Sequence, residues 1–239
     1  VYKRQMLTHG NLIANMQQLR ACLSQHGADG QPMLKDGREI MIGPLPLYHI
    51  YAFTANCMGM MVTGNHNVLI TNPRDIKGFI KELKNWKFTC FLGLNTLFVA
   101  LMDHPDFKSV DFSGLKITNS GGTALVKATA ERWEKLTGCR IGEGYGLTET
   151  SPVASANPCG QLARLGTVGM PVPGTAMKVI SDEGVDLGLG ERGEWCVKGP
   201  QVMKGYWQNP EATAEVLDAE GWFKTGDIAV IDPDGFVRI

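Results

Sequence analysis

Hydrophobic residues recur with a helical period near the start of the chain. Apolar residues four, three and four positions apart predict one apolar helix face after a helix start near Thr8. These residues are Leu12, Met16, Leu19 and Leu23. The strand patterns that follow are 67–71, 88–92, 115–119 and 140–143, with helical patterns at 75–86, 95–102 and 125–137. Strands that alternate with helices predict an α/β fold with a mainly parallel sheet and flanking helices.

The pattern changes near residue 150, where helical spacing fades and short strands separated by turns take over. The expected strands are 176–180, 194–198, 228–231 and 236–239. One helix interrupts them, with Asn209 as its N-cap and Pro210 at its first position. We therefore expect an α/β subdomain over 6–150, followed by a smaller β-rich, barrel-like subdomain over 151–239.

The two ends of the chain do not have the pattern of domain boundaries. Residues 1–5 run into the first helix signal without an initiator Met, so we interpret them as a translation scar and exclude them from the fold. The strand pattern at 236–239 is still running where the sequence stops. We therefore expect the chain to be a segment of a longer protein.

Charge and cysteine content narrow the class of protein. Lys and Arg number 23 and Asp and Glu 24, a formal net charge of −1, whereas a general nucleic-acid binder carries a basic excess. The six cysteines form no Cys-X-X-Cys pair and are too sparse for a disulfide scaffold, so we expect reduced thiols and a cytoplasmic location. The longest apolar stretches fall short of the roughly 18 residues that a membrane span needs.

The densest group of candidate binding residues follows an expected buried strand, the place where open α/β sheets bind ligands. Gly144 and Gly146 let the backbone approach a ligand, and the ring of Tyr145 offers a stacking face for a purine. The Thr148 hydroxyl can donate to a phosphate oxygen, and the Glu149 carboxylate is a hard ligand suited to Mg²⁺. The alternative is a polar loop whose glycines only make turns.

Three smaller groups carry further candidates. Gly121, Gly122 and Thr123 stand between a strand and a helix, where small residues and a helix N-terminus suit an anion, although a plain turn has the same pattern. Asp227 could accept hydrogen bonds from both hydroxyls of a ribose, or be a turn residue. His49 lies among aromatic and aliphatic residues and could be a general base or a packed structural residue.

Three motifs occur together, in this order, in one family. Residues 145–150 match its Tyr-Gly-Leu-Thr-Glu-Thr signature, 206–213 its Tyr-Trp…Asn-Pro…Thr run, and 221–227 its Gly-Trp…Thr-Gly-Asp motif. The sequence therefore resembles the AMP-forming, adenylate-forming enzymes, which include acyl-CoA synthetases, luciferases and adenylation domains of peptide synthetases. The subgroup it looks most like is the bacterial long-chain fatty acid–CoA ligases, through residues 6–9, 46–50, 69–75 and 196–203.

The resemblance implies an activity in two steps. A fatty acid carboxylate attacks the α-phosphorus of ATP to give acyl-AMP and pyrophosphate, and the thiol of CoA then displaces AMP. The implied partners are fatty acid, ATP and CoA, with Mg²⁺ as the metal, and peripheral contact with the inner membrane is compatible with such a substrate. By this resemblance, Gly121, Gly122 and Thr123 line the adenine, and Tyr145, between Gly144 and Gly146, stacks on it. Asp227 would bind the ribose, Thr148 would contact the α-phosphate, and Glu149 would hold Mg²⁺. His49 would lie near the acyl carboxylate.

Two parts of the family's pattern are missing from this sequence. The Gly/Ser/Thr-rich phosphate loop should lie just upstream of Met6, and the neighbours of Lys3 do not match that loop, so Lys3 is given no role. The hinge and the small C-terminal domain are also missing. We therefore expect the segment to be inactive alone. The alternatives are another adenylate-forming ligase, which acts on an acyl–carrier protein or a short-chain acid, and a non-catalytic binding module.

Overall fold

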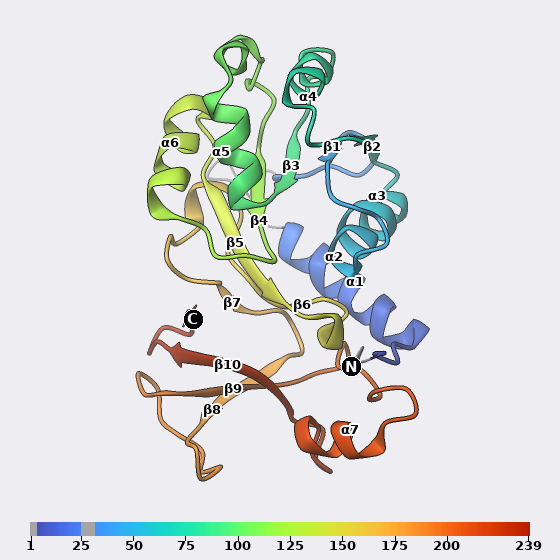
Figure 1. Ribbon diagram of the computed structural model, residues 1–239, viewed down its shortest axis with the longest axis vertical. Coiled ribbons are helices and arrows are strands. Elements are labelled where there is room, and N and C mark those ends of the chain that lie inside the picture. Colours follow the sequence, from blue (N-terminus) through green and yellow to red (C-terminus); the bar gives the residue numbers. More distant parts are fainter. Residues whose placement is uncertain (1–3, 25–31) are drawn as a thin grey trace.

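A computed structural model describes residues 4–24 and 32–239 and contains two β-sheets, with helices around the larger one (Figure 1). The larger sheet has seven strands in the order β2-β1-β3-β4-β5-β6-β7. The strands from β1 to β5 pair in parallel, and β6 and β7 continue the sheet in antiparallel pairing. Their bounds are β1 Ile40–Gly43, β2 His66–Leu69, β3 Cys90–Gly93, β4 Ile117–Ser120, β5 Ile141–Gly146, β6 Val153–Ala156 and β7 Met170–Pro171.

Helices cover both faces of the parallel part of this sheet. They are α1 His9–Leu23, α2 Ile50–Ala52, the π-helix η1 Phe53–Met58, α3 Gly59–Val62, α4 Ile76–Leu83, α5 Asn95–Asp103 and α6 Lys127–Thr137. Successive strand residues point to opposite faces. Ile42 and Phe91 thus pack with α4, α5 and α6, whereas Met41, Cys90 and Leu92 belong to a second cluster on the side of α1 and α3.

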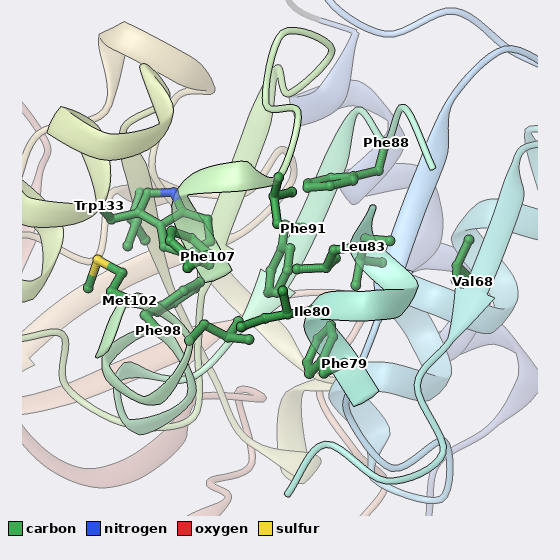
Figure 2. Packing of buried hydrophobic residues seen from close by; sticks show 14 residues of the cluster. Val68, Phe79, Ile80, Leu83, Phe88, Phe91, Phe98, Met102, Phe107 and Trp133 are labelled. Atoms are coloured by element: carbon green, nitrogen blue, oxygen red, sulfur yellow. The ribbon is translucent and has the colours of Figure 1, made fainter. Parts of the chain in front are cut away.

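Aromatic rings dominate the first of these clusters. Figure 2 shows Phe91 between the side chains of α4 and Trp133 of α6. The ring centroids of Phe91 and Trp133 are 5.5 Å apart, and those of Phe98 and Trp133 are 4.7 Å apart. Both pairs have the edge-to-face geometry that aromatic quadrupoles favour. This aromatic packing holds α4, α5 and α6 on the face of the first sheet that is opposite to α1.

The second sheet is antiparallel, in the order β11-β10-β9-β8, and lies at the opposite end of the molecule from α4 (Figure 1). Its strands are β8 Ala176–Ile180, β9 Arg192–Lys198, β10 Phe223–Ile231 and β11 Val237–Arg238, and α7 Pro210–Val216 precedes β10. Asn209 caps α7 as expected, because its side chain accepts a hydrogen bond from the N–H of Ala212. The α/β class and the smaller β-rich part are both confirmed.

The pattern of the sequence missed β1 and misplaced the end of the first sheet. The burial of β1 lacks the alternation that identifies a strand, because three of its four residues are buried. The first sheet runs on to residue 171 rather than ending at 150, because β6 folds back on β5 with Ser155 opposite Tyr145. The helical turns α2, η1 and α3 were also missed.

Helix α1 begins as expected but buries a different face. Thr8 caps it, and its side chain and that of Asn11 form a reciprocal capping box. The residues that α1 buries are the polar Asn15 and Gln18, while the predicted apolar face from Leu12 to Leu23 is only partly buried. The helix therefore presents its apolar face to a cavity and its amide side chains to the protein interior.

The start of the described chain takes part in the fold. Gln5 forms an antiparallel bridge with Tyr206, and the carbonyl of Arg4 accepts a 2.7 Å hydrogen bond from the N–H of Trp207. Residues 4 and 5 thus pair with residues 206 and 207 of the fold, although we excluded them from it on the sequence alone. Lys3 lies outside the described residues.

Candidate active site

The candidate residues converge at the carboxyl ends of β4 and β5, which are neighbouring parallel strands. The glycine loop that begins at Gly121 follows β4, and the short helix η3 Thr148–Thr150 follows β5. A cavity of about 380 Å³ is lined by most of the predicted residues. They are His49, Gly121, Gly122, Gly144, Tyr145, Gly146, Thr148 and Glu149. The structure therefore brings together residues that are up to 100 positions apart in the sequence.

Two predicted residues are outside the lining of this cavity. Thr123 is exposed in the loop after Gly122. Asp227, on β10 of the second sheet, is nonetheless joined to the site, because its Oδ2 accepts a 2.5 Å hydrogen bond from the hydroxyl of Tyr145. The structure thus links the Thr-Gly-Asp motif to the Tyr-Gly-Leu-Thr-Glu-Thr signature across 82 positions.

The ring of Tyr145 is supported from behind by Trp195 of β9, at 4.5 Å between ring centroids. Burial raises the pKa of the Tyr145 hydroxyl, and the hydrogen bond to Asp227 raises it further. The hydroxyl is therefore a neutral donor at physiological pH. Trp195 and Asp227 together fix the orientation of this ring, which is what a stacking platform requires.

Glycine is needed at two positions for different reasons. At Gly146 an added Cβ would lie 2.1 Å from the carbonyl oxygen of Pro152, so the requirement comes from the chain's own β5–β6 turn rather than from a ligand. Gly122 has a φ of +79°, the left-handed region that favours glycine, and an added Cβ would make only an ordinary contact of 3.8 Å with Cδ2 of Leu94. At Gly146 the simpler interpretation, a glycine that makes a turn, accounts for the residue.

The carboxylate of Glu149 is held through one of its two oxygens. Its Oε1 accepts hydrogen bonds from the Tyr206 hydroxyl at 2.9 Å and from Nε2 of Gln5 at 3.0 Å. Among the described residues, no group of three or more His, Cys, Asp or Glu side chains could hold a metal ion. A lone carboxylate fits Mg²⁺, which takes one or two protein carboxylates and completes its shell with substrate phosphates and water.

His49 caps helix α2 with its own side chain. Its Nδ1 accepts a 3.2 Å hydrogen bond from the N–H of Tyr51, so the proton of the neutral ring is on Nε2. Tyr51 in turn donates a 2.7 Å hydrogen bond to Oδ1 of Asn119, and its ring covers Gly121. Burial raises the pKa of the Tyr51 hydroxyl. Tyr51 and Asn119 connect the His49 turn to the glycine loop, although neither was among the predicted site residues.

The rest of the cavity lies between the sheet and helices α1 and α3, and its lining is largely apolar. It includes Met16, Leu19 and Leu23 of α1, Met41, Leu92 and Ile117 of the strands, and Ala55 and Met60. Burial raises the pKa of the Cys90 and Cys159 thiols there to about 12, so both stay protonated at neutral pH. The cavity therefore joins a polar end at Glu149 to a largely apolar end at α1, where Arg20 and Ser24 also belong to the lining.

Among the described residues, no helix is long and apolar enough to cross a lipid bilayer.

Known proteins resemble this chain along its whole length. A long-chain-fatty-acid–CoA ligase of Salmonella typhimurium is 48% identical over all 239 residues, and one of Haemophilus influenzae is 48% identical over 241. The chain spans about two fifths of the length of these relatives, 41% and 42%. The solved structure of a long-chain-fatty-acid-CoA ligase of Archaeoglobus fulgidus is 29% identical, with a TM-score of 0.83 over 99% of this chain and 48% of that one.

A second solved structure connects the fold to a nucleotide. ATP-bound MatB of Rhodopseudomonas palustris is 28% identical, with a TM-score of 0.81 over 99% of this chain and 44% of that one. The family model described as AMP-binding enzyme matches residues 3–207, which is most of the chain. Because this match covers most of the chain, the chain belongs to the family of AMP-binding enzymes.

Proposed function

We propose that this chain is part of a ligase that activates long-chain fatty acids with ATP and transfers them to CoA. The observation that carries the proposal is the single cavity with a polar end at Glu149 and an apolar end at α1. Identity of 48% to long-chain-fatty-acid–CoA ligases over the whole chain supports the same substrate class. The acyl chain would occupy the apolar end, and ATP the end at Tyr145.

In the first step the chain's residues orient two reactants rather than form a covalent bond. Tyr145 stacks on the adenine, Asp227 accepts hydrogen bonds from the ribose, and Thr148 donates to the α-phosphate. The carboxylate oxygen of the fatty acid forms a bond to the α-phosphorus, and the bond to pyrophosphate breaks. Such a reaction depends mainly on positioning and on stabilising charge.

The polar end also has groups that handle charge. Glu149 would hold Mg²⁺, which neutralises phosphate charge when bound. The Nε2–H of His49 is free to donate to the fatty acid carboxylate, because Nδ1 is occupied as an acceptor. In the second step the thiol of CoA loses its proton to solvent, its sulfur bonds to the acyl carbon, the acyl–phosphate bond breaks, and AMP leaves. No residue is assigned to CoA.

The test requires the parts of the relatives that this chain does not cover. We would graft residues 6–239 in place of the matching segment of the Salmonella ligase and measure ATP–pyrophosphate exchange with palmitate and with acetate. Chimeras of a related ligase have been solved with ATP bound. We expect exchange with palmitate and little with acetate, whereas a clear preference for acetate would contradict the long-chain assignment.

A second candidate function is ligation of another acid to CoA. The solved structures that resemble this chain include a malonyl-CoA ligase with methylmalonyl-CoA and AMP, at 28% identity, so the fold does not select the acid. The apolar side chains of Met16, Leu19 and Leu23 in the lining favour a long chain over a small dicarboxylate. The unmodified host ligase provides the positive control, and a non-catalytic module would show no exchange with any acid.

A further inference from the structure

A tyrosine from a distant part of the chain contacts the candidate metal ligand. The hydroxyl of Tyr206 donates a 2.9 Å hydrogen bond to Oε1 of Glu149, 57 positions away. The Tyr206 side chain is 4% exposed and its ring packs in the core of the second sheet. Gln5 contacts the same oxygen at 3.0 Å. Neither hydrogen bond uses Oε2.

The backbone around Tyr206 is fixed from several directions. The carbonyl of Glu149 accepts a 2.8 Å hydrogen bond from the N–H of Met203, so the two segments are joined by main chain as well as side chain. The N–H of Tyr206 donates to Oγ1 of Thr213 at 2.9 Å. The N–H of Met6 donates a 2.8 Å hydrogen bond to the carbonyl of Gly205, and the carbonyl of Met6 accepts a 3.0 Å hydrogen bond from the N–H of Lys204. The position of the phenol oxygen is therefore set by the fold and not by a freely rotating side chain.

We propose that Tyr206 is a positioning residue for Glu149: its hydroxyl holds Oε1 so that Oε2 is presented to the metal ion that accompanies ATP. Metal-binding carboxylates are commonly held by hydrogen bonds of this kind, and loss of such a partner typically lowers metal affinity about 10- to 100-fold. The inference rests on the proposed function, since it assumes that Glu149 holds the metal. It adds a role for the Tyr-Trp motif, whose residues the mechanism above does not use.

The test compares Tyr206→Phe with the parent graft described above, which starts at residue 6 and so does not carry Gln5. Phenylalanine keeps the ring in its apolar contacts and removes only the hydroxyl. Binding of Mn²⁺ in the presence of ATP would be measured by electron paramagnetic resonance, and binding of ATP without metal by calorimetry. We expect Mn²⁺ affinity to fall about 10-fold or more, with no change in metal-free ATP affinity. Tyr48→Phe, at a side chain that is 93% exposed, is the control and should change neither.

A double-mutant cycle separates positioning from a loss of general stability. In a Glu149→Gln background, Tyr206→Phe should have no further effect on Mn²⁺ binding, whereas a purely structural role would weaken binding by the same factor in both backgrounds. Mn²⁺ affinity within about twofold of the parent in Tyr206→Phe, or an equal loss in both backgrounds, would overturn the proposal. If the parent itself bound ATP but no Mn²⁺, the assignment of Glu149 as metal ligand would fail as well.

Discussion

Asn15 connects helix α1, which forms part of the cavity wall, to the start of β6, the strand that follows Glu149. We expect the loss of Asn15 to disturb this connection most. Asn15 is fully buried, its Oδ1 accepts a 3.0 Å hydrogen bond from the N–H of Val153, and its Nδ2 donates at 2.8 Å to the Val153 carbonyl. Val153 lies four residues after Glu149. The amide side chain of Asn15 thus makes the two backbone hydrogen bonds that a neighbouring strand would otherwise make with Val153.

The perturbation is Asn15→Leu, which keeps the approximate size and removes both hydrogen bonds to Val153, together with a 3.0 Å hydrogen bond from Nδ2 to Oε1 of Gln18. A buried N–H without a partner costs about 1–3 kcal/mol. The Val153 carbonyl retains Nε2 of Gln201 at 3.5 Å, so its contribution is smaller. We therefore expect the free energy of unfolding to fall by about 2–4 kcal/mol. With a urea m-value of about 1–3 kcal/mol/M, the midpoint should fall by about 1 M or more.

The assay is urea denaturation of the chain followed by tryptophan fluorescence. Gln17→Leu is the matched control, because it makes the same kind of change on the exposed face of the same helix and should alter stability by no more than about 0.5 kcal/mol. If Asn15→Leu and Gln17→Leu shifted the midpoint equally, the reasoning from the buried amide would be refuted. In the graft, Asn15→Leu should also weaken ATP binding, because the segment after Glu149 loses its anchor.

Three further changes test other parts of the account. Tyr145→Ala in the graft should weaken ATP binding about 5- to 150-fold, since base–aromatic stacking is worth about 1–3 kcal/mol; an unchanged dissociation constant by calorimetry would argue against stacking. Leu19→Trp, on the cavity wall, should lower the ratio of palmitate to octanoate activity about 10-fold or more in pyrophosphate exchange, and a constant ratio would place the acyl chain elsewhere. Burial alone would raise the pKa of Glu39, but hydrogen bonds from Lys116 and other donors hold it below its ordinary value of 4.5. The ionised Glu39 therefore stabilises the fold above pH 4.5, and this stabilisation is lost as the pH falls. At pH 7 the free energy of unfolding of Glu39→Gln should be about 1–3 kcal/mol below that of the parent chain, and this difference should shrink in acid. A gap that stayed constant down to pH 3 would contradict the ion-pair argument.

The proximity of the candidate site residues could be predicted because most of them stand in contiguous motifs at strand ends. Residues 144–149 follow β5 directly, and the glycine loop follows β4, so the parallel order of the two strands was enough to bring them together. The hydrogen bond between Tyr145 and Asp227 could not be predicted, since it joins the two sheets and depends on how the second sheet packs on the first. Resemblance to the family supplied the roles that spacing alone left open.

The cavity wall could not be predicted, because helical periodicity identifies an apolar face but not its neighbour. The residues from Leu12 to Leu23 have the pattern of a core-facing stripe, yet three of them line the cavity. The buried residues of α1 are instead the polar Asn15 and Gln18. Their side chains form hydrogen bonds to backbone and amide groups more than 130 positions away. Partners at such separations leave no local signal in the sequence.

The most direct test of the account is binding of two stable acyl-adenylate analogues to the graft by calorimetry. In palmitoyl and acetyl sulfamoyl-adenosine the nucleotide part is the same, so the difference in affinity reports only on the apolar end of the cavity. If one continuous cavity holds adenylate and acyl chain, the palmitoyl analogue should bind more tightly by about 10-fold or more, since each buried methylene contributes about 0.8 kcal/mol, and Leu19→Trp should remove much of that advantage. Equal affinities for the two analogues would contradict the account.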